Sequence, residues 1–80
     1  HREAQKELDK LADPVLKPLE AAIGGLASNP RPFGVKKLTR DLHRIRVGSW
    51  RIVYAILDKE RHVIVLRVVR RSEKTYKHLL

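Results

Sequence analysis

Three arginines in the second half of the chain have the type and spacing needed to bind a phosphate. Arg44 and Arg46 alternate along one segment, and Arg51 follows the pair Gly48-Ser49. A guanidinium group binds phosphate oxygens through paired hydrogen bonds and stays charged at ordinary pH. Such a set can hold a nucleic-acid backbone and stabilise charge that develops on a phosphate. The alternative is a solvated basic face whose arginines point into water.

The overall charge agrees with an anionic partner. Among 80 residues, 18 Lys and Arg stand against nine Asp and Glu, which gives a formal charge of +9 and a pI near 10.5. A balance this basic indicates a nucleic acid, the ribosome or an acidic protein as partner. The length allows one domain, residues 1–80, and a chain this short buries only about 60% of its unfolded surface. A partner protein could supply further burial.

Several classes of protein are not supported by the composition. No apolar run approaches the roughly 18 residues of a membrane span, and no signal-peptide pattern opens the chain. Cysteine is absent, which fits a cytoplasmic protein. The four histidines (His1, His43, His62 and His78) are scattered without carboxylate spacing, and the acidic residues are dispersed. We therefore expect no membrane, no metal, no cofactor and no paired-carboxylate mechanism.

The first half of the chain has helical periodicity. Apolar residues recur at helical spacing through residues 2–12, and Asp13-Pro14 has the composition of a new helix start, with Asp13 as N-cap. A second helix is expected over residues 14–27, bent or delayed by Pro18. Asn29-Pro30-Arg31-Pro32 then forms a stiff loop.

From Leu42 the period becomes alternating. Residues 42–47, 50–57 and 62–70 are predicted as three strands, joined by a tight II′ turn at Gly48-Ser49 and a second turn at 58–61. Ser72 can cap a last short helix. The expected fold is α+β: two N-terminal helices packed on one face of an antiparallel β-meander, with a short C-terminal helix.

The two-residue turn sets which side chains share a face. Val47 then pairs with Trp50, Ile45 with Ile52 and His43 with Tyr54, on the face that packs against the helices. Trp50, Tyr54 and His43 are thus expected to be structural residues. The opposite face gathers the arginines, with Arg46 facing Arg51 and Arg44 facing Val53. Like charges in direct opposition destabilise a sheet unless an anion binds there.

The third strand leaves one choice open. A regular four-residue turn that pairs Leu57 with His62 places Arg70 on the Arg51 face. A longer or shorter turn, or a bulge, places Arg71 there instead.

Four segments carry a recognisable pattern: Lys36-Lys37-Leu38, the hairpin from Leu42 to Tyr54, the pair Arg70-Arg71 with Ser72, and Tyr76. Together they resemble the RelE/ParE family of bacterial toxins. It extends over nearly the whole chain, including the Asn-Pro-Arg-Pro loop. The family usually has a strand before the helices, which is not found here.

The resemblance implies a toxin of a type II toxin–antitoxin system. RelE-type toxins cut messenger RNA in the ribosomal A site by attack of a ribose 2′-hydroxyl on the adjacent phosphate, without a metal. The resemblance implies that Arg51 and Arg71 stabilise the charge of the transition state. It also implies that Arg44 and Arg46 hold the phosphates, and that Tyr76 stacks on a base or transfers a proton. Lys36, Lys37 and Arg70 are expected to contact RNA. The implied partners are a cognate antitoxin, messenger RNA and the ribosome.

Two other functions remain open from the sequence. A ParE-like chain of the same fold inhibits DNA gyrase and lacks nuclease chemistry. A third possibility is an inactive basic module that binds RNA or protein.

Arg44 and Arg46 occupy positions that are often lysine in the family, and arginine hardly gives up a proton. Acid–base duty would then fall to Tyr76 or to ribosomal RNA.

Overall fold

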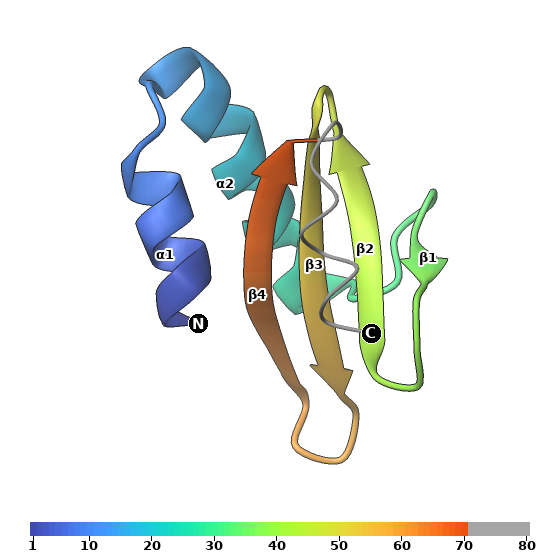
Figure 1. Ribbon diagram of the computed structural model, residues 1–80. Coiled ribbons are helices and arrows are strands. Elements are labelled where there is room, and N and C mark those ends of the chain that lie inside the picture. Colours follow the sequence, from blue (N-terminus) through green and yellow to red (C-terminus); the bar gives the residue numbers. More distant parts are fainter. Residues whose placement is uncertain (71–80) are drawn as a thin grey trace.

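The computed structural model describes residues 1–70 of the chain. They form two helices and a four-stranded antiparallel sheet in the order β1-β2-β3-β4. Figure 1 shows α2 behind the sheet and α1 beside the β4 edge. The predicted α+β architecture is therefore confirmed. The predicted C-terminal helix, with Ser72 and Tyr76, lies outside the described residues.

Helix α1 spans Arg2–Asp9, so it ends three residues earlier than predicted. The His1 ring nitrogen Nδ1 accepts a hydrogen bond from the Glu3 N–H at 3.2 Å, which caps the first turn. After Asp9 the chain turns, with the Leu11 N–H donating to the Leu8 carbonyl at 3.0 Å. Ala12 is extended, at φ −77° and ψ 156°, and this breaks the helical run.

Helix α2 spans Asp13–Ser28. The predicted N-cap was wrong by one residue: Ala12 holds that position without a side-chain hydrogen bond, and Asp13 is the first helical residue. There its carboxylate interacts favourably with the positive end of the helix dipole. Pro18 lies inside the helix and does not delay its start, although it has no N–H to donate to the Pro14 carbonyl.

Strands β2 (Leu42–Val47), β3 (Trp50–Leu57) and β4 (His62–Arg70) have the predicted bounds. Gly48 has φ +59°, and Ser49 is not among the residues with positive φ. Positive φ at the first turn position only is what a II′ hairpin requires. The first hairpin consequently has the predicted register from Val47–Trp50 to His43–Tyr54.

The sheet has one strand more than predicted. Strand β1, Lys36–Lys37, pairs with β2 so that Lys36 faces Arg44 and Lys37 faces His43. Two residues are too few to show an alternating pattern, which is why the sequence did not reveal this strand. Within residues 1–70 no strand precedes α1.

A bulge interrupts the second hairpin. Leu57 pairs with His62 as predicted, but Tyr54 pairs with Val65 and Val53 with Arg67, which leaves Leu66 as the extra residue. From there to its end β4 presents the opposite set of side chains to each face. The end of β4 therefore follows the bulged alternative.

The core lies between the helices and the inner face of the sheet. Tyr54 and Ile52 are fully buried there, against Leu19 and Leu26 of α2 and Ala4 of α1. The helices thus pack against one face of the sheet, and the predicted arginines of β2 and β3 lie on the other. No helix in residues 1–70 has the length and apolar character required to cross a membrane.

Candidate functional site

The face of the sheet opposite the helices carries the predicted arginines together. Arg46 pairs with Arg51 and Arg44 with Val53, so all three arginines point the same way. Lys36 joins them, because its cross-strand partner is Arg44. We call the surface formed by Lys36, Arg44, Arg46 and Arg51 the arginine face.

Two cross-strand pairs on the arginine face carry like charges. Lys36 opposes Arg44, and Arg46 opposes Arg51. Facing residues have Cβ atoms about 4.5–5.5 Å apart, and like charges at that spacing destabilise a sheet by a few tenths to about 1 kcal/mol. Lys36 and Arg46 are exposed, while Arg44 and Arg51 are half-buried.

Arg67 also points to this side of the sheet because of the bulge, beside Val53. Its guanidinium makes two hydrogen bonds to the Glu7 carboxylate of α1, from Nε at 3.1 Å and from the terminal nitrogen at 2.8 Å. Glu7 also accepts the backbone N–H of Val68 at 2.9 Å. Glu7 therefore fastens α1 to the edge strand β4 and borders the arginine face with a carboxylate. The bulge brings Arg67 here, since the bulged register that the sequence left open for Arg71 places Arg67 on the same face.

The structure does not bring two of the predicted RNA contacts to the arginine face. Lys37 pairs with His43 and so points to the helix side of the sheet. Arg70 pairs with Trp50, and its guanidinium carbon lies 5.6 Å from the centre of the Trp50 ring. This cation–π contact explains how a charged group is accommodated beside the core. Arg71 and Tyr76 lie outside the described residues.

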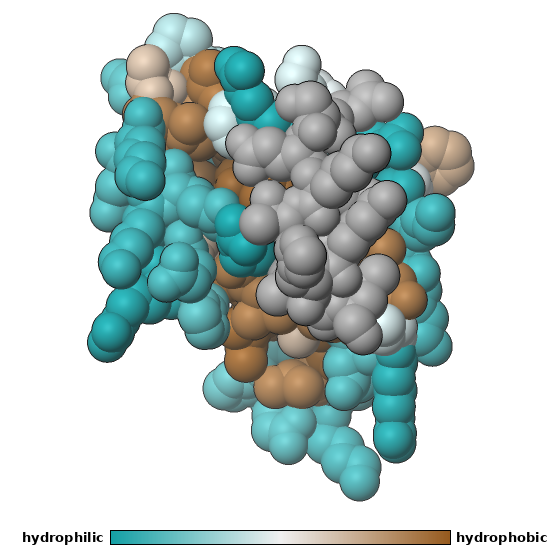
Figure 2. Space-filling model, viewed as in Figure 1, coloured by the Kyte–Doolittle hydropathy of each residue, from teal (hydrophilic) through white to brown (hydrophobic). Residues whose placement is uncertain are grey.

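The other half of the same sheet face is apolar. Leu42, Ala55 and Ile64 form one cross-strand row, and all three are half-buried. Figure 2 shows an apolar strip over the lower part of β4, beside the hydrophilic side chains of α1. A basic region thus adjoins an apolar one on a single face of the sheet.

Tyr54 and His43 form a structural cluster on the helix side, as predicted. Their rings stack at 5.9 Å between centroids, and His43 is only 5% exposed. The Tyr54 hydroxyl donates to the Pro30 carbonyl at 2.7 Å, and burial raises the pKa of the Tyr54 phenol. The His43 ring nitrogen Nδ1 lies 3.1 Å from the Asp41 carbonyl oxygen. These contacts hold the loop after α2 against the sheet, away from the arginine face.

A second contact fixes the same loop to the β3–β4 turn. Arg31 makes two hydrogen bonds to the Asp58 carboxylate, at 2.9 and 3.2 Å. These bonds lower the pKa of Asp58 and raise that of Arg31. Both side chains are at least half exposed, so the pair contributes little to stability. Among residues 1–70, His, Asp and Glu do not gather into a group of three that could hold a metal.

The chain is similar to known toxins in sequence. Residues 1–75 match the family described as the ParE toxin of the type II toxin–antitoxin system parDE. A protein of Methanocaldococcus jannaschii assigned as toxin RelE1 is 32% identical over 98% of this chain and 91% of its own length. The toxin RelE of Mycobacterium tuberculosis is 36% identical over 86% of this chain and 74% of its own.

Solved structures share the fold. The isolated RelE toxin of E. coli superposes with a TM-score of 0.74 and 25% identity over 95% of this chain and 85% of that one. RelE-type chains in two toxin–antitoxin complexes give similar values. The E. coli RelBE complex has a TM-score of 0.77 at 25% identity, over 91% of this chain and 93% of that one. A RelBE complex of M. tuberculosis has 0.73 at 32% identity, over 89% of this chain and 91% of that one. This chain belongs to the RelE/ParE superfamily of toxins from type II toxin–antitoxin systems.

Proposed function

We propose that this toxin cleaves messenger RNA in the A site of the ribosome, in the cytoplasm, and that a cognate antitoxin restrains it. The observation that carries the proposal is the arginine face. Arg44, Arg46 and Arg51 lie on one side of a hairpin whose register is fixed by a two-residue turn. Their close spacing suits a ligand with several negative charges along one chain, such as an RNA backbone.

The proposed reaction is an attack of the ribose 2′-oxygen on the adjacent phosphorus, with loss of the 5′-oxygen. It leaves a 2′,3′-cyclic phosphate on one fragment and a 5′-hydroxyl on the other. One proton leaves the 2′-hydroxyl and one reaches the departing 5′-oxygen. Arg46 and Arg51 face each other across the hairpin and can stabilise charge on the non-bridging oxygens of the phosphorane.

The proton transfers need a group other than an arginine. Arginine keeps its proton at ordinary pH, so Arg44 and Arg46 act in this proposal as holders of phosphate. His43 is buried on the helix side and is not positioned for acid–base work. Tyr76 or a group of the ribosomal RNA would transfer the protons, and Arg71 would add a further cation.

The antitoxin is supported by the related chains and by charge. Two of the structural relatives are toxin–antitoxin complexes. The net charge of +9 favours an acidic partner, which would neutralise the arginine face while it covers apolar surface.

A second candidate function is inhibition of DNA gyrase. Its specific support is the match of this chain to the family that is described as the ParE toxin. Such an activity would use the same basic sheet to bind a protein or DNA and would break no RNA bond.

Primer extension on a defined messenger RNA tests the proposal. The purified chain is added to translating ribosomes, and separately to the same RNA without ribosomes. Cuts at the A-site codon that appear only with ribosomes and leave a 2′,3′-cyclic phosphate support the RNase. Intact RNA together with stalled gyrase and DNA breaks would support the second function instead.

A further inference from the structure

Trp50 differs from its neighbours on the helix side of the sheet. Ile52 and Tyr54 point the same way along β3 and are fully buried, whereas Trp50 is half-buried. Two hollows border the Trp50 side chain, one of about 310 Å³ beside α1 and one of about 230 Å³ beside α2. Packing against the core therefore uses only part of the surface of this ring.

The hollow beside α1 combines an aromatic ring with charged groups. Its lining consists of Trp50 and Val68 from the sheet and of Glu7, Lys10 and Leu11 from the end of α1 and the turn after it. We call it the Trp50 hollow. Its volume is at the lower end of the range of small-ligand sites, which is about 300–1,000 Å³. A flat aromatic surface with cations beside it is the composition that binds the bases of single-stranded nucleic acids.

Arg70 extends the aromatic surface. It lies two positions after Val68, on the same side of β4, and pairs with Trp50 across the strands. Its guanidinium carbon lies 5.6 Å from the centre of the Trp50 ring, and the residue is exposed. Bases stack on guanidinium planes as well as on aromatic rings. Trp50 and Arg70 thus offer a stacking surface that carries a positive charge.

The charges at the Trp50 hollow favour a ligand with a phosphate. The Glu7 carboxylate is held by the Arg67 guanidinium at 2.8 and 3.1 Å, so its negative charge is balanced within the protein. Lys10 and Arg70 are both exposed cations. A purely apolar ligand would gain nothing from these two cations. A nucleotide has a base for the ring and a phosphate for the cations.

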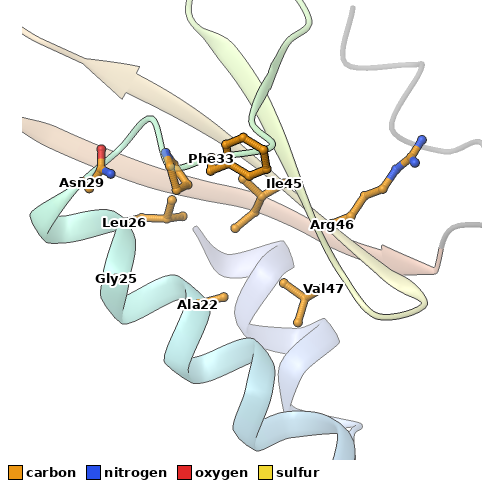
Figure 3. Close-up of a pocket in the computed structure, with 9 residues that line it drawn as sticks. Ala22, Gly25, Leu26, Asn29, Phe33, Ile45, Arg46 and Val47 are labelled. Atoms are coloured by element: carbon orange, nitrogen blue, oxygen red, sulfur yellow. The ribbon is translucent and has the colours of Figure 1, made fainter.

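The hollow of about 300 Å³ between α2 and β2 lacks this combination. Figure 3 shows Ala22 and Leu26 of α2 facing Ile45 and Val47 of β2, while the side chain of Arg46 points away. Among the described residues that line this hollow, Arg46 alone is charged. Its walls therefore direct no charge toward a ligand.

The Trp50 hollow adjoins the arginine face at the β4 edge. Glu7 lines the hollow, and its partner Arg67 points to the side of the sheet that carries the arginine face. Arg51 lies on β3, one strand further in, and neighbouring strands are only about 4.8 Å apart. An RNA strand that Arg51 holds can therefore pass the Glu7–Arg67 pair and place a following nucleotide beside Trp50.

We propose that the Trp50 hollow is a subsite for one base of the bound RNA, which stacks on Trp50 and Arg70 while Lys10 contacts its phosphate. This inference rests on the proposed function, because it takes RNA as the ligand. The subsite anchors a nucleotide outside the arginine face and so fixes the position of the strand along the sheet. It gives Arg70 an RNA contact on the opposite side of the sheet. Every base has a flat face, so we expect modest selectivity among the bases.

Fluorescence of Trp50, the single tryptophan, tests the stacking directly. The full chain is titrated with a short single-stranded RNA whose riboses are 2′-O-methylated, so that no 2′-oxygen can attack. An end label reports binding by anisotropy. We expect this RNA to quench Trp50 emission and the same backbone without bases to bind without quenching. Unchanged Trp50 emission at saturating RNA, or no binding of RNA at all, would overturn the proposal.

A nucleoside monophosphate distinguishes a base of RNA from a free nucleotide. The proposal predicts that the monophosphate quenches Trp50 only at much higher concentration than the RNA does, because it lacks the contacts to the arginine face. If the monophosphate quenches Trp50 at the same concentration as the RNA, the hollow is a site for free nucleotides and the proposal is wrong.

Two lysines of the first helical segment provide a matched pair of variants. Lys6 and Lys10 are both exposed, and of the two only Lys10 lines the hollow. In K10A the slope of log affinity against log salt should fall by about 0.7, the value of one phosphate contact with a single strand. K6A should leave the slope unchanged. Equal slopes in K10A and K6A would contradict the proposal.

Replacement of the ring separates stacking from packing. W50L should weaken RNA binding roughly tenfold, whereas W50F keeps an aromatic ring and should stay within about threefold of the wild type. Circular dichroism checks that each variant is folded, and if W50L is not, the quenching and the lysine pair decide. A folded W50L that binds RNA as the wild type does would reject the stacking.

The cleavage assay on ribosomes is read separately, with the wild-type chain. Base-dependent quenching of Trp50 without RNA cleavage would reject the RNase but keep the subsite. Cleavage at the A-site codon without quenching by RNA would keep the RNase and reject the subsite.

Discussion

Replacing Glu7 tests how a helix of only eight residues stays attached to the sheet. Its carboxylate accepts two hydrogen bonds from Arg67 and one from the Val68 N–H. The side chains of Glu7 and Arg67 are 21% and 22% exposed, so solvent screens this ion pair only in part. In the variant E7A, Arg67 keeps a half-buried charge and Val68 loses its acceptor. We expect a loss of about 2–3 kcal/mol, between the values for surface and buried pairs.

The loss is large for a domain of this size. A chain of 80 residues has a free energy of unfolding of roughly 4–12 kcal/mol. A loss of 2–3 kcal/mol should lower Tm by roughly 10–20 °C. Urea unfolding followed by Trp50 fluorescence and a thermal melt by circular dichroism both measure it. The control is E3A, which removes the same charge from an exposed position on the same helix. If E7A lies within about 0.5 kcal/mol of E3A, the fastening of α1 through Glu7 is refuted.

Three further changes test other parts of the structure. Y54F removes the hydrogen bond to the Pro30 carbonyl and should cost about 1 kcal/mol of unfolding free energy in urea titrations. Because the pKa of Tyr54 is raised in the folded state, wild-type stability should fall as pH rises above about 10, and Y54F should lack this contribution. The pKa of Asp58 is lower in the folded than in the unfolded chain. The ionised Asp58 therefore stabilises the fold above the unfolded pKa near 4, and this stabilisation is lost as pH falls through the folded pKa. Between pH 2 and 6, the free energy of unfolding should depend less on pH in D58N than in the wild type. Added salt should weaken this pH dependence in the wild type. R46T removes one cation of the arginine face and should lower the rate of RNA cleavage on ribosomes. An unchanged cleavage rate in a folded R46T would remove Arg46 from the proposed site.

The first hairpin was predictable because one local feature fixes its whole register. Gly48 at the first position of a two-residue turn sets the Val47–Trp50 pair, and alternation then places every arginine of β2 and β3. The helical spacing of apolar residues in α2 and the alternating pattern in the three long strands are also local, so these elements could be predicted too. The three arginines of the arginine face could therefore be placed from the sequence, whereas Lys36 could not, and the choice between Arg70 and Arg71 stayed open.

The parts that sequence did not predict depend on contacts between distant segments. The bulge at Leu66 has no local signature, yet it turns Arg70 toward Trp50 and Arg67 toward the arginine face. Lys36 and Lys37 are equivalent in sequence, and only pairing of β1 with β2 separates them onto two faces. The Glu7–Arg67 contact joins residues 60 positions apart.

The most direct measurement is the single-turnover rate of messenger RNA cleavage on ribosomes by wild type, R51A and R40A. Arg51 lies on the arginine face, whereas Arg40 is exposed in the turn between β1 and β2, so both variants lose one charge in different places. Folding of each variant is checked by Trp50 fluorescence. We expect R51A to be roughly 10²–10³-fold slower, because it loses a group that stabilises the transition state, and R40A to stay close to wild type. Equal rates for R51A and wild type, from a folded protein, would contradict the assignment of the arginine face as the site of cleavage.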